Sequence, residues 1–361
     1  MKLSVCMIAK NEEKVLERCL NALAPLNGEL VFTDTGSSDK TVSIAKRFTD
    51  KVYSFQWRDD FSAARNYCIG KASNDLILSL DCDEILNMEA MGNPSPEKLQ
   101  RELFERMRKN PEDVGRLTLI GLIGTEQNKQ ESRVVVRRLF DRRYFSFRDP
   151  IHEQLVRKDG CKHSSYDSGL IFTHLGYDLS PEERKKKAER NNRLLFAERK
   201  KHPKDAYIDY QIGKSYILME DNEKALEYLD SALTKQYDKT AEFVTDLLFC
   251  WGTLTLSSGN AAKAMGLERY MSSYGNSAEL LTLMGQIHAS NGLWQQALEE
   301  FSAALDIPEC DTPGSNTFLP LFYSGIIYDS IGDKEMAVEC LKASANMGYA
   351  PAKEELLKIT L

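Results

Sequence analysis

The chain has 361 residues and a net charge of −7, with 42% hydrophobic and 28% charged residues. These proportions are ordinary for a globular protein, and the length favours two domains over one. The acidic balance argues against nucleic-acid binding, because no basic excess is present to neutralise phosphates. The eight cysteines are scattered without a C-x-x-C pair, which is typical of reduced thiols in a cytoplasmic protein.

The N-terminal segment MKLSVCMIAKNEE contains a short apolar run followed by charged residues. This run is too short for the apolar region of a signal peptide or for a transmembrane segment. We therefore expect the segment to form a buried first strand.

Short apolar segments alternate with helical patterns in the first 90 residues. The predicted strands are LSVCMIA (3–9), ELVFTD (29–34), KVYSF (51–55) and DLILSLD (75–81), and the predicted helices between them cover 11–23, 37–48 and 61–72. Strict alternation predicts right-handed crossovers and a parallel sheet with helices on both faces. After residue 99 the alternation loosens, and residues 114–121, 132–140 and 169–176 indicate further strands, as antiparallel edges or a ribbon.

The pattern becomes entirely helical from Ser180. The sequence SPEE, residues 180–183, is a capping box that predicts a helix ending at His202-Pro203. Beyond it, one template recurs, with a glycine in the first helix and an alanine twelve residues later, so that paired helices approach closely. These pairs are Gly213/Ala225, Gly285/Ala297 and Gly325/Ala337, with a weaker copy at Gly252/Ala264. The template resembles the tetratricopeptide repeat.

The repeat resemblance implies a continuous helical core with a concave face suited to peptides. The alternatives are that the repeats only brace the N-terminal half or that they form a homodimer. We expect an α/β domain at residues 1–179, a connecting helix at 180–202 and an all-α repeat domain at 203–361.

Polar clusters follow three of the predicted parallel strands. Residues 10–12 follow the first, residues 34–39 the second, and Asp81, Asp83 and Glu84 the fourth. Because ligands of open parallel sheets sit at the carboxyl ends of the strands, these clusters predict a binding site on one rim. Single carboxylates such as Asp34 and Asp81 can accept hydrogen bonds from a nucleoside.

A diphosphate would be repelled by these acids without a cation. At about 5 Å and an effective dielectric constant near 20, each acid–phosphate pair costs about 3 kcal/mol. A Mg²⁺ or Mn²⁺ ion between them turns this repulsion into attraction, since these ions join carboxylates to phosphate oxygens. We expect such a divalent metal, with Asp83 as its ligand.

Four segments carry a resemblance to a known family. CMIAKNEE, VFTDTGSSDKTVSIAKRF, DDFSAARNYCIGKA and LSLDCDEIL are similar, in order and spacing, to the inverting family 2 glycosyltransferases of the GT-A fold. The resemblance covers about the first 175 residues. It implies a GT-A domain with a Rossmann-like mixed sheet, a nucleotide-sugar donor with UDP as the expected nucleotide, and transfer of a hexose.

The resemblance also implies roles in donor binding. Ala9 and Glu12 would border the nucleotide base, and Asp34 would bind it. Arg65 would lie near the nucleotide or its phosphates, with an ordinary helix-surface cation as the alternative. Asp81 would contact the ribose.

The later segments RDPIHEQL and LIFTHLGY suggest the remaining site residues. The first resembles a segment of the family branch that carries tetratricopeptide repeats, which makes Glu153 a candidate general base and His152 a candidate positioning residue. A base is needed because the acceptor must lose a proton as it attacks. His174 ends an apolar strand and would complete the metal site, with a structural histidine as the alternative.

The acceptor stays open between a peptide or protein side chain, a saccharide and a lipid-linked group. A peptide acceptor is implied by the similarity to bacterial enzymes that glycosylate a cysteine or serine of a small peptide. The alternative function is an inactive scaffold that serves as a protein-interaction module. We expect Arg137, Arg138, Arg142 and Arg143 to lie on a solvated strand face, with attraction of phosphates or of an acidic acceptor as the alternative. We expect no zinc at Cys161 and His163, which have no second ligand pair.

Overall fold

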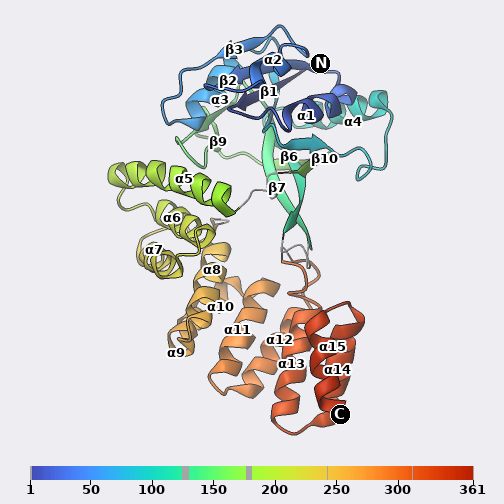
Figure 1. Cartoon of the computed structure of the whole chain (residues 1–361), viewed down its shortest axis with the longest axis vertical. Coiled ribbons are helices and arrows are strands. Elements are labelled where there is room, and N and C mark those ends of the chain that lie inside the picture. The colour runs from blue at the N-terminus through green and yellow to red at the C-terminus, as the bar shows by residue number, and fades with distance from the viewer. Residues whose placement is uncertain (1, 124–129, 176–180, 242, 311, 361) are drawn as a thin grey trace. The chain divides into compact units, whose positions relative to one another are not determined.

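The computed structural model describes residues 2–123, 130–175, 181–241, 243–310 and 312–360 (Figure 1). The chain divides into two compact units, Met1–Glu182 and Glu183–Leu361. None of the helices in these ranges combines the length and the apolar composition that a membrane crossing needs.

The N-terminal unit alternates strands and helices as predicted, up to β4. The strands are β1 (Leu3–Ala9), β2 (Glu29–Asp34), β3 (Val52–Ser54), β4 (Leu76–Leu80), β5 (Glu84–Leu86), β6 (Val114–Ile123), β7 (Gln130–Asp141), β8 (Phe145–Arg148), β9 (Gln154–Arg157) and β10 (Ser165–His174). The helices are α1 (Leu16–Ala22), the 3₁₀ turn η1 (Ala24–Leu26), α2 (Thr41–Ala45), α3 (Phe61–Gly70) and α4 (Pro96–Lys109). Strands β5, β8 and β9 and helix α4 were not predicted; the strands among them are only three or four residues long.

One mixed sheet contains most of these strands. Within the described residues its order is β3-β2-β1-β4-β7-β6-β10-β5, and β8 and β9 form a separate two-stranded ribbon. Strands β1 to β4 are parallel, β7 is antiparallel to both neighbours, and β10 is parallel to β6. The predicted α/β GT-A class with a mixed sheet is therefore confirmed. Of the two alternatives for the later strands, the ribbon is confirmed, because β6 and β7 form a long antiparallel pair. The edge alternative is wrong, because the short β3 and β5 occupy the edges.

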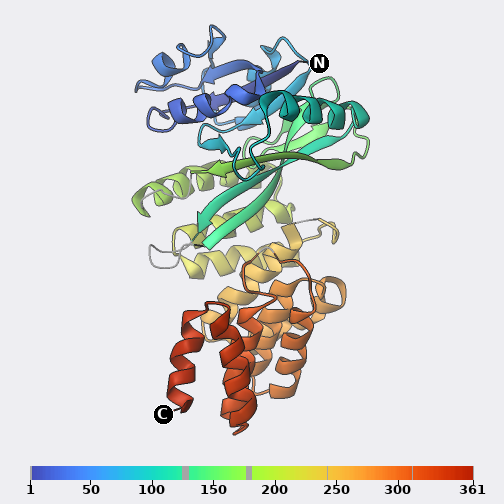
Figure 2. The same ribbon diagram turned by 90° about the vertical axis from the view of Figure 1, so that its right-hand side faces the viewer.

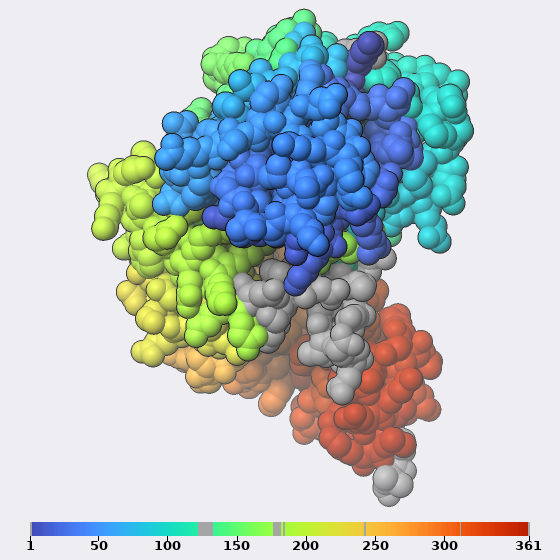
Figure 3. Space-filling model, turned by 45° about the horizontal axis from the view of Figure 1, so that its top comes forward, coloured from blue at the N-terminus to red at the C-terminus, as the bar shows by residue number. Residues whose placement is uncertain are grey.

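Helices cover both faces of the sheet, as the alternation predicted. Residues of α1 and α4 pack with one side of β1 and β4, in a cluster that includes Leu20, Leu103, Val5 and Leu78. Residues of α3 and β8 pack with the other side, where Cys6 lies. Figure 3 shows the N-terminal segments, coloured blue, as one continuous surface with the α4 segment at its side.

The C-terminal unit is helical throughout its described residues. Its helices are α5 (Pro181–Lys201), α6 (Ala206–Leu218), α7 (Asn222–Thr234), α8 (Phe243–Ser257), α9 (Ala261–Ala264), the 3₁₀ turn η2 (Met265–Leu267), α10 (Glu268–Tyr274), α11 (Ala278–Ser290), α12 (Trp294–Leu305), α13 (Phe318–Ser330), α14 (Lys334–Asn346) and α15 (Ala350–Thr360). Helix α5 ends where the sequence predicted, whereas Ser180, the predicted cap, lies outside the described residues. The short α9 explains why the copy around Gly252 is the weakest match to the template.

Glycines let the paired helices of the repeats touch, as predicted. A Cβ atom on Gly213 would lie 2.8 Å from Leu229, and one on Gly325 would lie 2.7 Å from Leu341. At Gly285 the nearest atom would be Cε1 of Phe301, at 2.4 Å. Contacts this short would push the second helix of each pair away from the first.

Gly285→Ala should therefore destabilise the repeat unit. Overpacking a close helix contact costs about 1–3 kcal/mol, and calorimetry should show a lowered melting transition. Gly70→Ala is the matched control, because its Cβ would meet no atom within 4 Å. If both variants had the melting temperature of the wild type, the ring of Phe301 would have moved aside at no cost in stability.

We expect His288 to make the stability of the repeat unit depend on pH. The side chain is buried on α11, and its Nδ1 has no hydrogen-bond partner within the described residues. Burial lowers the pKa of His288, although Glu268 and Glu299 oppose that shift. Below about pH 6.5 the unfolded chain therefore takes up a proton that the folded chain does not, and stability falls as the pH drops. Thermal melts from pH 7 to pH 5 should show a smaller decrease for His288→Gln than for the wild type.

Candidate active site

The strand registers bring the three predicted polar clusters together. Ala9 pairs with Asp34 across β1 and β2, and Met7 pairs with Leu80 across β1 and β4, so these strands end on one rim. The loops after β1 and β2 are tied by hydrogen bonds from Asn11 N to Ser37 Oγ, from Glu12 N to Thr41 Oγ1 and from Thr35 N to Ala9 O. The sequence was right that these clusters converge.

Asp34 holds its own loop in shape. Its buried carboxylate accepts hydrogen bonds from the amides of Gly36, at 3.0 Å, and Ser37, at 3.2 Å. Gly36 has a φ of 109°, a conformation that glycine adopts readily. The structure thus places the predicted base-binding residues Ala9, Glu12 and Asp34 beside one another, with Asp34 stabilising the turn.

Arg65, on α3, is the centre of a charged network. Its guanidinium donates to Glu153 Oε1 at 2.6 Å, Ser79 Oγ at 3.2 Å and Asp81 Oδ1 at 2.8 Å. The residue is 5% exposed, which rules out the alternative of a helix-surface cation. Burial opposes its charge, but Asp81 and Glu153 together raise the pKa of Arg65, so the guanidinium stays protonated.

Arg138, on β7, completes this network from the other side. Its Nη2 lies 2.9 Å from Asp81 Oδ2, and its Nη1 lies 3.2 Å from Glu84 Oε2. Burial opposes ionisation, but Arg138 and Arg65 hold the pKa of Asp81 well below its usual range. Burial also raises the pKa of Glu84 to about 7. The expectation that Arg138 lies on a solvated face is wrong, because Asp81 and Glu84 hold its guanidinium. The register between β6 and β7 shifts at this residue, so strict alternation along the strand could not have identified it.

Two arginines, Arg65 and Arg138, neutralise Asp81 and Glu84, so these acids do not need a metal ion to lie close together. Of the three acids after β4, Asp83 is the one whose carboxylate contacts neither arginine in the described contacts.

Asp83 and His174 form the pair predicted for the metal. Asp83 Oδ2 lies 3.2 Å from His174 Nε2, with exposed fractions of 25% and 22%, and the Leu175 amide donates to Asp83 O at 2.9 Å. The hydrogen bond to Asp83 raises the pKa of His174, with burial opposing it. Two adjacent ligands of an octahedral ion at about 2.1 Å would lie about 3 Å apart, so this pair fits Mg²⁺ or Mn²⁺. Within the described residues no third His, Cys, Asp or Glu joins them, and such an ion would take its other ligands from diphosphate and water.

The loop before β9 brings Glu153 against Arg65. The amide of Phe61 and the hydroxyl of Ser62, at the start of α3, donate to the carbonyls of Pro150 (2.8 Å) and Asp149 (2.6 Å). His152 in the same loop has a φ of 51°, a backbone conformation that costs energy and is common at functional sites. The structure therefore groups Glu153 with Arg65 and Asp81.

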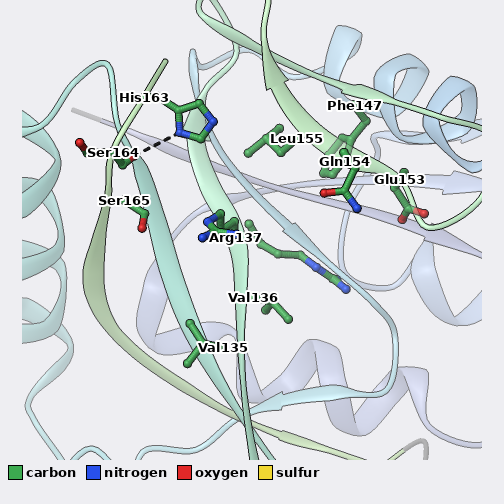
Figure 4. A pocket seen from close by; sticks show the side chains of 11 residues that line it. Val135, Val136, Arg137, Phe147, Glu153, Gln154, Leu155, His163, Ser164 and Ser165 are labelled. Carbon is green, nitrogen blue, oxygen red and sulfur yellow. Dashed lines mark hydrogen bonds between the residues drawn. The ribbon is translucent and has the colours of Figure 1, made fainter. Parts of the chain in front are cut away.

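A polar pocket of about 560 Å³ opens beside this network (Figure 4). Residues from β7, from β9 and from the start of β10 line it, and Glu153 lies at one side. The lining side chains are Val135, Val136, Arg137, Arg138, Phe147, Glu153, Gln154, Leu155, His163, Ser164 and Ser165. Only Glu153 and Arg138 belong to both the pocket and the charged network. The sequence did not predict this pocket, because its lining residues come from β7, β8, β9 and the segment around the start of β10, which no local sequence pattern groups together.

Two parts of the chain match models of known protein families. Residues 4–144 match the model of glycosyl transferase family 2, and residues 210–234 match that of the tetratricopeptide repeat. The N-terminal unit is thus similar to family 2 glycosyltransferases and part of the C-terminal unit to tetratricopeptide repeats, as the sequence resemblance indicated.

Particular relatives share parts of this arrangement. A TPR repeat-containing protein of Synechococcus elongatus is 28% identical over 79% of this chain and 68% of its own length. The SPbeta prophage-derived glycosyltransferase SunS of Bacillus subtilis is 25% identical over 70% of this chain and 58% of its own length. Among solved structures, that of YrrB, titled a TPR protein with an unusual peptide-binding site, has 19% identity over 48% of this chain and 84% of its own, with a TM-score of 0.41.

Proposed function

We propose that this chain transfers a hexose from a UDP-sugar to an acceptor nucleophile, with inversion at the sugar and with Mn²⁺ or Mg²⁺ bound. The observation that carries the proposal is the Asp83–His174 pair beside the network of Arg65, Asp81 and Glu153. A family 2 domain supports the reaction class. Free cysteines throughout the described residues support a cytoplasmic location.

Each site residue has a task in this reaction. Ala9, Glu12 and Asp34 surround the base, and Asp81, oriented by Arg65 and Arg138, accepts hydrogen bonds from the ribose. Asp83 and His174 hold the metal ion, which would supply positive charge to the departing diphosphate.

Glu153 is the proposed general base. Its Oε1 accepts from Arg65, whereas its Oε2 has no protein partner in the described contacts, so Oε2 can take the acceptor's proton. The acceptor oxygen or sulfur then bonds to the sugar carbon from the face opposite the diphosphate. The bond to the diphosphate breaks and UDP leaves with the electron pair. His152 positions the loop that carries this base.

The acceptor is proposed to be a peptide or protein side chain. Arrays of tetratricopeptide repeats generally expose surfaces that bind peptides, and the pocket beside Glu153 is open to the exterior.

Titration calorimetry with UDP, with and without Mn²⁺, tests the donor half of this proposal. We expect UDP to bind at least about tenfold more tightly with Mn²⁺, a difference of about 1.4 kcal/mol. A panel of UDP- and GDP-sugars should then reveal one donor that the protein hydrolyses slowly. Equal affinity for UDP in both conditions and no hydrolysis of any donor would favour the inactive scaffold.

A further inference from the structure

Strands β4 and β7 separate next to the candidate active site. Their pairing covers only Leu76 to Leu78 of β4, opposite Asp141 to Leu139 of β7. Beyond this point β4 leads to Asp81, whereas β7 continues beside β6 (Figure 2). Within the described residues, the stretch 134–136 of β7 therefore has a neighbouring strand on the β6 side only.

Exposed apolar side chains mark the same stretch of β7. Val134 is 44% exposed and Val135 is 58% exposed. Proteins usually protect such an edge with charges, proline or a covering loop, because its backbone groups can pair with another strand. An uncovered edge with valines is therefore a suitable place for an extended chain to bind.

This edge leads directly to the reacting groups. Val135 and Val136 line the pocket that also contains Glu153 and Arg138. Arg138 bonds to Asp81, and four residues of strand from Val134 to Arg138 span about 13 Å. A chain lying along β7 would thus reach the candidate base within four residues.

We infer that the acceptor, on the function proposed above, is an extended polypeptide segment that pairs its main chain with residues 134–136 of β7. Its side chains next to the reacting residue contact the apolar part of the pocket, formed by Val135, Phe147 and Leu155. The reacting hydroxyl or thiol then lies near Glu153. A saccharide has no regular array of amides and carbonyls and would leave this edge unused.

A peptide library tests this inference. The protein, Mn²⁺ and the active UDP-sugar are incubated with ten-residue peptides that each contain one central serine, threonine or cysteine. We expect mass spectrometry to detect sugar addition to a subset of the peptides. Methylating each amide nitrogen of a modified peptide in turn should reduce transfer at every second position, because alternate amides face β7 in an antiparallel or parallel pairing.

Several outcomes would overturn the inference. If UDP binds with Mn²⁺ but no peptide is modified, the function survives and the peptide acceptor fails. If the effect of amide methylation on transfer does not alternate from one position to the next, the peptide is recognised through its side chains. Pairing with β7 would then be wrong. If UDP does not bind at all, the proposed function fails first.

Substitution of the edge provides an independent measurement. Val135→Lys should raise the KM for a modified peptide at least about tenfold, while Leu218→Lys, at an equally exposed leucine of α6 (61%), should not change it. Equal values for the two variants would contradict docking on β7. A wild-type dimer that dissociates in Val135→Lys, without any peptide transfer, would assign the edge to a second copy of this chain.

Discussion

Replacing Arg65 by methionine is expected to destabilise the N-terminal unit by about 3–5 kcal/mol, the usual cost of removing one partner from a buried ion pair. Arg65 is 5% exposed and contacts Glu153, Asp81 and Ser79. In the variant Asp81 keeps Arg138, but the carboxylate of Glu153 loses its cation. Transfer activity should fall together with stability, since Glu153 loses the partner that orients it.

Calorimetry measures this loss of stability. The melting transition that Gly285→Ala lowers belongs to the repeat unit, which distinguishes it from the transition of the N-terminal unit. Arg47→Met is the matched control: Arg47 pairs with Glu17 at 2.7 Å, but both side chains are more than half exposed, and such pairs contribute at most about 1 kcal/mol. If Arg65→Met and Arg47→Met had the same melting temperature, the charged network around Arg65 would not stabilise the fold.

Asp83→Asn is expected to have the largest effect on catalysis with little effect on folding. The amide keeps the size of the side chain but removes the negative charge that would hold the metal beside His174. We expect transfer to fall by about 100-fold, which corresponds to about 3 kcal/mol. The affinity for UDP should no longer depend on Mn²⁺.

Asp75→Asn is the control for Asp83→Asn. Asp75 precedes β4, at the opposite end of that strand, and its half-exposed carboxylate pairs with Arg142 and Arg143. Its kinetics should stay within about twofold of the wild type. If the Asp83→Asn protein still bound UDP more tightly with Mn²⁺ than without it, Asp83 would not be a metal ligand.

The sequence anticipated elements whose signal is local. Parallel strands are buried on both faces, so β1, β2 and β4 appear as largely apolar runs. Lys10 follows β1, Asp34 ends β2 and Asp81 follows β4. The glycine and alanine template similarly indicated helix pairs, because each pair is one local hairpin. Short strands such as β5 and β9 carry too few residues to show a period.

By itself, therefore, the sequence determined the alternation of the first four strands with helices, the rim on which the acids gather and the repeat architecture, because these follow from hydrophobic periodicity and from the polarity of parallel strands. Only the tertiary structure decided how the charges are balanced. Arg138 reaches Asp81 because β7 pairs with β4 across more than fifty positions of sequence, and no local pattern encodes such a contact. The same long-range pairing ends at Leu78, which leaves the edge of β7 beside the pocket.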